Sequence, residues 1–170
     1  MTKDANKRDS NPKIKHLTFR LGDSEYGVPL SVVKEVIGLP LLVEIPGGPN
    51  YFLGLINLRG KVITAIDLRT KLGFEPEVSR KKRQAIVVTD VGEIILGCVV
   101  DSISAVINIS EADIDRDLSI NIPGNRNAIQ GVAHFKDRPM ILLLDLKQAA
   151  DISEVTELKS KELHKEGRVS

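Results

Sequence analysis

Short apolar runs separated by glycine, proline and charged residues recur along the whole chain. Such runs, rich in β-branched residues, cover residues 14–22, 26–28, 52–58, 61–68, 85–89, 93–100, 130–135 and 140–146. Their length and composition are typical of β-strands rather than of helices. Short polar or glycine-containing turns join them in pairs, so the pattern predicts an all-β fold assembled largely from hairpins.

Both halves of the chain carry the same pattern. The strand at residues 26–30, with the apolar positions that follow it, is repeated at residues 96–100, and the hairpin at residues 54–68 is repeated at residues 131–146. Repetition at this distance indicates a duplicated folding unit, because the repeats of solenoids are shorter. Each half is small for an independent domain, so we expect the two halves to share apolar contacts.

One segment carries a helical pattern inside the first half. Leu30, Val33 and Val36 fall on a single helical stripe, and Ser31 can cap the first turn. We therefore expect about two turns of helix there, and a shorter turn at residues 102–105 in the second half.

Shorter features fill the remaining gaps between strands. Residues 41–45 have the composition of a strand, and the prolines and glycines of residues 46–50 predict a loop after it. Residues 110–113 resemble a capping box on a single helical turn. Residues 121–127 contain proline and glycine and are expected to form another loop.

The domain boundaries follow from composition. Residues 1–13 are polar without periodicity and are expected to form a disordered lead. One domain is expected over residues 14–150, with its halves at about 14–79 and 80–150, because the charged, proline-containing segment between them reads as a linker. Residues 151–170 form a charged tail, in which a helix beginning at Ser153 is expected.

Composition excludes several classes of protein. Lys and Arg total 24 against 23 Asp and Glu, a formal net charge of +1, so no long-range field attracts polyanions. The basic residues 80–83 adjoin acidic residues, which favours a solvated loop over a nucleic-acid patch. Cys98 lies in an apolar run and is expected to be buried rather than reactive. No signal peptide or membrane span is present, so we expect a cytoplasmic protein.

The sequence offers no active site. His16, His134 and His164 are dispersed without metal-ligand spacing, and no phosphate-binding glycine motif occurs. Asp67 and Asp145 occupy equivalent positions at strand ends, so a structural hydrogen bond is a better explanation for them than acid–base catalysis. We therefore expect no enzyme activity, no metal and no cofactor.

A set of short motifs resembles one family. The stretch Asn57-Leu58-Arg59-Gly60, with residues 62–63 and 66–69 after it, resembles the signature of CheW, the coupling proteins of bacterial chemotaxis. Residues 22–27, 99–103 and 140–146 resemble the family's first hairpin, its Val-Asp segment and its final strand. The resemblance covers about residues 15–150, and one departure is Thr64, where the family commonly has proline.

This resemblance implies both a fold and a function. The fold would be two five-stranded SH3-like barrels, at about residues 14–79 and 80–150, packed across a third apolar core, with short helical turns and a C-terminal helix. The function would be that of a non-catalytic adaptor. Its partners would be the regulatory domain of a CheA-type histidine kinase and the cytoplasmic tip of transmembrane chemoreceptors. Protein contacts alone would hold it in receptor arrays at the inner membrane.

The resemblance also implies site residues. Those of a receptor-binding groove would be Arg59, Asn57, Leu58, Gly60, Leu30, Val33, Val36, Val100 and Asp101. Kinase binding would involve the region that contains Leu41, Val43, Leu53 and Leu55. A competing interpretation places Leu30, Val33 and Val36 simply in the core.

Two alternative functions remain open at this point. Small β-barrels also bind nucleic acid, although this chain has no Trp and few aromatic residues for base stacking. A coupling protein of a non-flagellar chemosensory pathway would carry the same motifs.

Overall fold

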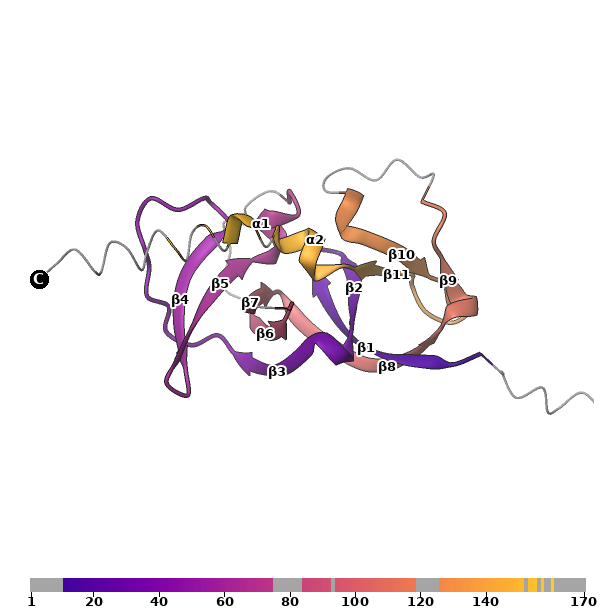
Figure 1. Ribbon diagram of the computed structural model, residues 1–170. Helices are drawn as coiled ribbons and strands as arrows, with labels where there is room; N and C mark the ends of the chain where they lie inside the picture. The colour runs from indigo at the N-terminus through magenta and orange to yellow at the C-terminus, as the bar shows by residue number, and fades with distance from the viewer. Residues whose placement is uncertain are drawn as a thin grey trace, which may run out of the picture.

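The computed structural model describes residues 11–74, 84–92, 94–118, 126–151, 153–155, 157 and 160, and it confirms the all-β fold. The strands form two sheets (Figure 1). Sheet A contains, in spatial order, β8 (Ser102–Ser110), β1 (Lys13–Leu21), β2 (Ser24–Pro29), β11 (Ile141–Leu144), β10 (Ile129–Ala133) and β9 (Ile114–Asp115). Sheet B contains β3 (Val33–Gly38), β6 (Ala85–Asp90), β7 (Ile95–Val100), β5 (Lys61–Asp67) and β4 (Phe52–Leu58). Each sheet curls into a small SH3-like barrel.

Short helices connect the strands. The 3₁₀ turns are η1 (Leu30–Val32), η2 (Glu111–Asp113) and η3 (Arg126–Ala128), and the α-helices are α1 (Leu68–Lys71) and α2 (Leu146–Ala150). The two α-helices lie together above the junction of the barrels (Figure 1). In η2 the Ser110 hydroxyl accepts a hydrogen bond from the amide of Ala112, which confirms the expected helical turn there.

Three local expectations were wrong. Only Leu30–Val32 is helical, and the chain from Val33 onward is strand β3, because its backbone pairs with β6. The expected turn at residues 102–105 is likewise the start of β8, which pairs with β1. Residues 41–45 do not form a strand and contribute only an isolated bridge from Val43 to β4.

At the chain ends and in the connecting segments, the structure differs less from the sequence-based predictions. Strand β1 already begins at Lys13, inside the expected lead, whereas residues 1–10 and the linker at 75–83 lie outside the described residues. Most of the expected loop at 121–127 also lies outside them, and its last residues belong to η3. Helical backbone occurs at residues 153–155, as expected for the tail.

The two barrels do not correspond to the two halves of the chain. The β1–β2 hairpin from the first half lies in sheet A between β8 and β11, both from the second half. The β6–β7 hairpin from the second half lies in sheet B between β3 and β5. The division at residue 80 is therefore wrong for the barrels, because the parallel pairings of β2 with β11 and of β7 with β5 exchange the hairpins.

Strand pairing nevertheless confirms the duplication. Leu17 pairs with Val106 in sheet A, and their counterparts in the other repeat, Val87 and Val36, pair in sheet B. The two-residue strand β9 also has a counterpart, since it borders β10 as the Val43 bridge borders β4. Both barrels therefore have an extra segment paired to the edge of their hairpin, and this segment is long enough to count as a strand, β9, only in sheet A.

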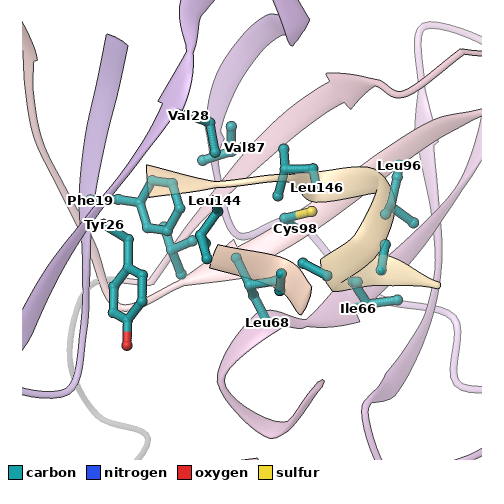
Figure 2. Packing of buried hydrophobic residues seen from close by; sticks show 14 of the residues in the cluster. Phe19, Tyr26, Val28, Ile66, Leu68, Val87, Leu96, Cys98, Leu144 and Leu146 are labelled. Atoms are coloured by element: carbon teal, nitrogen blue, oxygen red, sulfur yellow. The ribbon is translucent and has the colours of Figure 1, made fainter. Parts of the chain in front are cut away.

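Three apolar clusters stabilise this arrangement, and the largest joins the sheets. Phe19, Tyr26 and Val28 from sheet A meet Val87 and Leu96 from sheet B around the junction (Figure 2). A smaller cluster fills each barrel: one around Ile56 and Ile86 in sheet B, the other around Ile109 and Ile141 in sheet A. Burial of each such side chain contributes roughly 1.5–3 kcal/mol, so the junction is a core and not a loose contact.

Cys98 lies within the central cluster, as expected (Figure 2). Its side chain is buried, and burial raises the pKa of the thiol to about 12. The thiolate that would be needed for reactivity is therefore strongly disfavoured.

Candidate functional site

The turn between β4 and β5 presents Arg59 to solvent. Leu58 pairs with Lys61, which leaves Arg59 and Gly60 as a two-residue loop, with φ values of 52° and 81°. Two positive φ values in succession define a type I′ turn, which matches the twist of the strands it joins. The Asn57 side chain fastens the turn by accepting a hydrogen bond of 3.0 Å from the amide of Gly60.

Arg59 occupies a backbone conformation that suits glycine or asparagine better. A residue with a branched or long side chain in the left-handed region is strained by about 1 kcal/mol or more. Nothing in the fold of the turn itself requires arginine, because asparagine or glycine would satisfy the same φ. Strain of this kind at an exposed cation is typical of a functional position.

An ion pair joins the turn to the other edge of sheet B. The Arg59 Nη2 atom donates to Glu35 Oε2 at 2.9 Å, and the Arg59 side chain stays 79% exposed. Strands β3 and β4 are the two edges of the sheet, so this exposed contact links the two edges. It also leaves most of the guanidinium free to face a partner.

The apolar residues expected beside Arg59 are divided between core and surface. Val36 is 40% exposed on β3, next to Glu35. Leu30 and Val33 are half-buried and pack against the central cluster. Leu58 is half-buried against the cluster inside sheet B. The core interpretation thus fits Leu30 and Val33 but not Val36, and the groove assignment of all three stays a prediction.

Val100 and Asp101 were expected on the opposite wall of the groove, and the structure gives them other surroundings. Val100 is 1% exposed and belongs to the central cluster, so it offers no contact surface. Asp101 is half-buried, and its Oδ2 accepts hydrogen bonds from the Gly22 amide and from Arg69 Nη1, each at 2.7 Å. Its carboxylate is thus engaged inside the protein.

A second exposed surface lies along the edge of β4. Val43 and Leu55 exchange backbone hydrogen bonds of 2.8 and 2.9 Å, and Val43 is 65% exposed. Leu41 is 94% exposed, whereas Leu53 and Leu55 are half-buried. Of the four residues expected in a kinase-binding region, the structure therefore brings Val43 and Leu55 together and leaves Leu41 projecting.

Gly54 makes this second surface possible. Its φ is 137°, and a Cβ atom there would collide with the carbonyl oxygen of Val43. The segment before β4 can approach the sheet only because the side chain is absent. At Gly131, the counterpart in the other repeat, a Cβ atom would likewise crowd β9, at 2.7 Å from the Ile114 side chain and 3.0 Å from the Asp115 carbonyl oxygen.

The chemistry of the described residues is structural. Asp67 caps α1 and Asp145 caps α2, as their equivalent strand-end positions predicted. Within the described part of the chain, no group of three or more His, Cys, Asp or Glu side chains could hold a metal ion. No helix among these residues is both long and apolar enough to span a membrane.

Two residues of these surfaces were missed at the sequence level. Glu35 is the partner of Arg59, and it could have been found only if residues 33–38 had been interpreted as a strand. Val62 is 59% exposed and pairs with Asn57, so it lies beside the turn. Exposed and half-buried residues alternate along β3, but the apolar and polar residues of the sequence do not follow this alternation, so the local sequence carries no signal for Glu35.

Comparison with known proteins identifies the family. The family model described as CheW-like domain matches residues 15–154. The chemotaxis protein CheW of Rhizobium meliloti (strain 1021) is 35% identical over 143 residues, which cover 78% of this chain and 89% of that protein. The probable chemotaxis protein CheW of Rhizobium etli is 33% identical over 131 residues, 77% of this chain and 83% of that protein.

A solved structure agrees. The scaffolding protein TtCheW from Thermoanaerobacter tengcongensis superimposes with a TM-score of 0.71 at 28% identity, covering 79% of this chain and 90% of that one. The duplicated barrels, the Asn57–Gly60 turn and these matches lead to one conclusion. The chain belongs to the CheW-like family, the scaffold and coupling proteins of chemotaxis.

Proposed function

We propose that this protein is a non-catalytic adaptor that couples transmembrane chemoreceptors to a CheA-type histidine kinase. The observation that carries the proposal is that two separate groups of exposed residues, Val36 with Arg59 and Leu41 with Val43, lie on or beside sheet B. The receptor surface consists of Leu30, Val33, Val36, Asn57 and Arg59. The kinase surface consists of Leu41, Val43, Leu53 and Leu55.

The receptor surface suits an amphipathic helix. Arg59 has a forked cation that can bind carboxylates or helix-terminal carbonyls, and the neighbouring Val36 offers an apolar contact. Leu30 and Val33 supply half-buried apolar atoms at the base. A helical receptor tip that presents an apolar stripe flanked by acidic or carbonyl oxygens would match this combination.

The kinase surface suits another β-barrel. Leu39, Leu41 and Val43 are 42%, 94% and 65% exposed within five residues of chain, and a group of exposed apolar side chains is typical of an interaction surface. Val43 extends the edge of β4 with only a single bridge, so its neighbours retain backbone groups that a partner strand can reach. The regulatory domain of the kinase is the partner of this kind that the resemblance implies.

The mechanism is that of a scaffold. When both surfaces are occupied, the kinase is held beside the receptor at a high effective concentration, and receptor conformational changes can bias its activity. The protein would then sit on the cytoplasmic side of the inner membrane, in receptor arrays, through protein contacts alone.

Calorimetric titration with the two partners tests the proposal. Arg59→Glu should weaken binding to a receptor-tip fragment at least about tenfold, as expected at a central cation of an interface, and leave kinase-domain binding unchanged. Val43→Glu should have the opposite pattern. Lys136→Glu, an exposed cation in the corresponding turn of the other barrel, should change neither affinity.

Failure of the folded wild-type protein to bind the kinase domain would refute the adaptor function. Titration with single-stranded DNA tests the nucleic-acid alternative, since such binding should be strong at low salt and fall steeply as salt is added.

A further inference from the structure

The chain crosses between the two sheets at two places that occupy the same position in the two repeats. It leaves sheet A for sheet B at η1, between β2 and β3, and returns at Asp101, between β7 and β8. The two crossings lie near opposite ends of β1, because Pro29 pairs with His16 and the Asp101 amide donates to the carbonyl of Arg20. The orientation of the barrels therefore depends on the contacts that the residues at each crossing make with the two sheets.

At the Asp101 crossing, a compact polar cluster joins the sheets. The Asp101 carboxylate receives the Gly22 amide from the β1–β2 turn of sheet A. The same oxygen receives Arg69 Nη1 from α1, which follows β5 of sheet B. Both distances are 2.7 Å, and the side chains of Arg69 and Asp101 are only 16% and 24% exposed. Charge-assisted bonds in such a partly desolvated place are stronger than surface ion pairs.

Aromatic contacts extend this cluster into the core. The Arg69 guanidinium lies over the ring of Phe74, 5.7 Å from its centroid. Phe74 in turn meets Tyr26 edge-to-face at 6.3 Å, and Tyr26 belongs to the central cluster. The cluster is thus braced against side chains of sheet A on one side and α1 on the other.

At the η1 crossing, the corresponding residues are different. Ser31 stands where the other repeat has Asp101, and it is exposed. Gly92 and Lys147 are the counterparts of Gly22 and Arg69, and the Lys147 Nζ atom lies 4.0 Å from where a Cβ of Gly92 would be. Because a serine has no charge to attract this lysine, the η1 crossing is stabilised by apolar packing of Leu30 and Val33 against the central cluster.

We propose that Asp101 is a positioning residue that fixes the orientation of the two barrels and thereby the shape of the receptor surface. The functional part of this proposal rests on the proposed adaptor function. Within the receptor surface, Val33, Val36 and Arg59 all belong to the barrel of sheet B, whereas Leu30 lies in η1, where the chain passes from sheet A to sheet B. A change in barrel orientation therefore moves Leu30 relative to Arg59. The kinase surface lies entirely on sheet B and does not depend on that orientation.

The first test measures barrel orientation without any partner. Spin labels at Val62→Cys in sheet B and Met140→Cys in sheet A, both 59% exposed, report the distance between the barrels. The native Cys98 is buried and does not compete for label. Asp101→Asn should broaden or shift the distance distribution, and Arg69→Gln, which leaves Asp101 charged, should do the same. Unchanged distributions in both folded variants would overturn the proposal.

A matched control distinguishes a change in barrel orientation from the general effect of removing a partly buried ion pair. Glu25 and Arg138 also form a partly buried pair, at 2.8 Å, but Glu25 lies in β2 and Arg138 in the connection between β10 and β11, so both belong to the barrel of sheet A. Glu25→Gln should therefore leave the interbarrel distances unchanged. If Glu25→Gln broadened the distribution as much as Asp101→Asn, the effect would be one of stability alone and the positioning role would be refuted.

The second test measures binding. Asp101→Asn should weaken receptor-tip binding about tenfold, within the usual range of coupling between sites, and leave kinase-domain binding within error of wild type. Altered distances with unchanged receptor affinity would overturn the role of Asp101 in binding while leaving the adaptor function intact. If wild type itself bound no receptor tip, the adaptor function would fail, and the distance measurement would still decide the structural claim.

Discussion

Asp67 and Asp145 perform the same task at the same place in the two repeats. Each ends its strand and caps the helix that follows: the Asp67 carboxylate accepts from the amides of Arg69 and Thr70, and the Asp145 carboxylate from those of Lys147 and Gln148. The two differ in burial, since Asp67 is 8% exposed and Asp145 is half-buried. Because the two residues have the same role but differ in burial, replacing each one shows how burial changes the contribution of a helix cap to the free energy of unfolding.

Asp67→Ala should destabilise the protein more than Asp145→Ala. Loss of a helix cap costs about 1 kcal/mol. Each carboxylate also accepts one side-chain hydrogen bond, Asp67 from the Thr70 hydroxyl at 3.1 Å and Asp145 from Gln130 Nε2 at 3.2 Å. Because Asp67 is buried and would leave unpaired donors out of reach of water, its replacement should cost about 2 kcal/mol or more. Urea denaturation measures both values. Asp137→Ala, in an exposed turn, is the control and should change stability little. Equal losses at Asp67 and Asp145 would show that burial adds nothing to the cap.

Arg59→Asn should remove receptor binding without destabilising the fold. Asparagine is favoured in type I′ turns, which relieves strain of about 1 kcal/mol, whereas the ion pair of an exposed arginine contributes less than about 1 kcal/mol. The free energy of unfolding should therefore stay equal or rise slightly, while calorimetry shows weaker binding of the receptor tip. A loss of more than about 1 kcal/mol would mean that the contact with Glu35 holds the barrel closed.

Gly54→Ala should detach the Val43 segment from β4. The added methyl group would collide with the Val43 carbonyl at a φ of 137°, and overpacking with backbone strain costs roughly 1–3 kcal/mol. Gly38→Ala is the matched control, because no atom lies within 4 Å of a Cβ there. Kinase-domain binding should fall only for Gly54→Ala. Normal binding by that variant would remove Val43 from the kinase surface.

The C-terminal segment should loosen in acid. Glu154 Oε2 lies 2.8 Å from Lys71 Nζ, which also stands 4.0 Å from the centroid of the Tyr51 ring. The hydrogen bond from Lys71 lowers the pKa of Glu154 below its ordinary value of 4.5. A carboxyl with a lowered pKa stabilises the fold above its unfolded pKa, and this contribution disappears as the pH falls through the folded value.

Thermal unfolding of wild type and Glu154→Gln checks this pH dependence. The variant should be less stable than wild type at neutral pH, and the difference should vanish well below the ordinary pKa. The pKa of Asp151 is also lowered, mainly by the Ser153 hydroxyl, so the wild-type curve alone would not isolate Glu154. A constant difference across the whole pH range would contradict the assigned ion pair.

The hairpins were predictable because their signals are local. Arg59 and Gly60 between two apolar runs indicate a tight turn whichever strands they join, and the structural hydrogen bonds of Asp67 and Asp145 were expected from their equivalent strand-end positions, although the short helix that Asp67 caps was not. Arg59 as a site residue came from the family resemblance rather than from any property of the turn.

The errors arose where long-range pairing overrides local pattern. Leu30, Val33 and Val36 have helical spacing, but β3 has an irregular register against β6 between Val33 and Glu35. The strand nevertheless alternates regularly, so Val33 is half-buried and Val36 is exposed on the opposite face, and the helical spacing of these residues did not mark one buried stripe. Val100 was assigned to the groove by the family resemblance, although the continuous apolar run around it is typical of a strand buried on both faces.

The exchange of hairpins has a consequence for how this protein could be divided. Each barrel borrows two strands from the other half of the chain, so a cut between residues 74 and 84 would leave both pieces with unpaired strands and an incomplete core. The pieces should be unable to fold alone but able to restore each other when mixed. A single repeat alone could likewise form complete barrels only if two copies associated and exchanged a hairpin. The present chain therefore has the architecture of a hairpin-swapped dimer whose two copies are joined in one polypeptide.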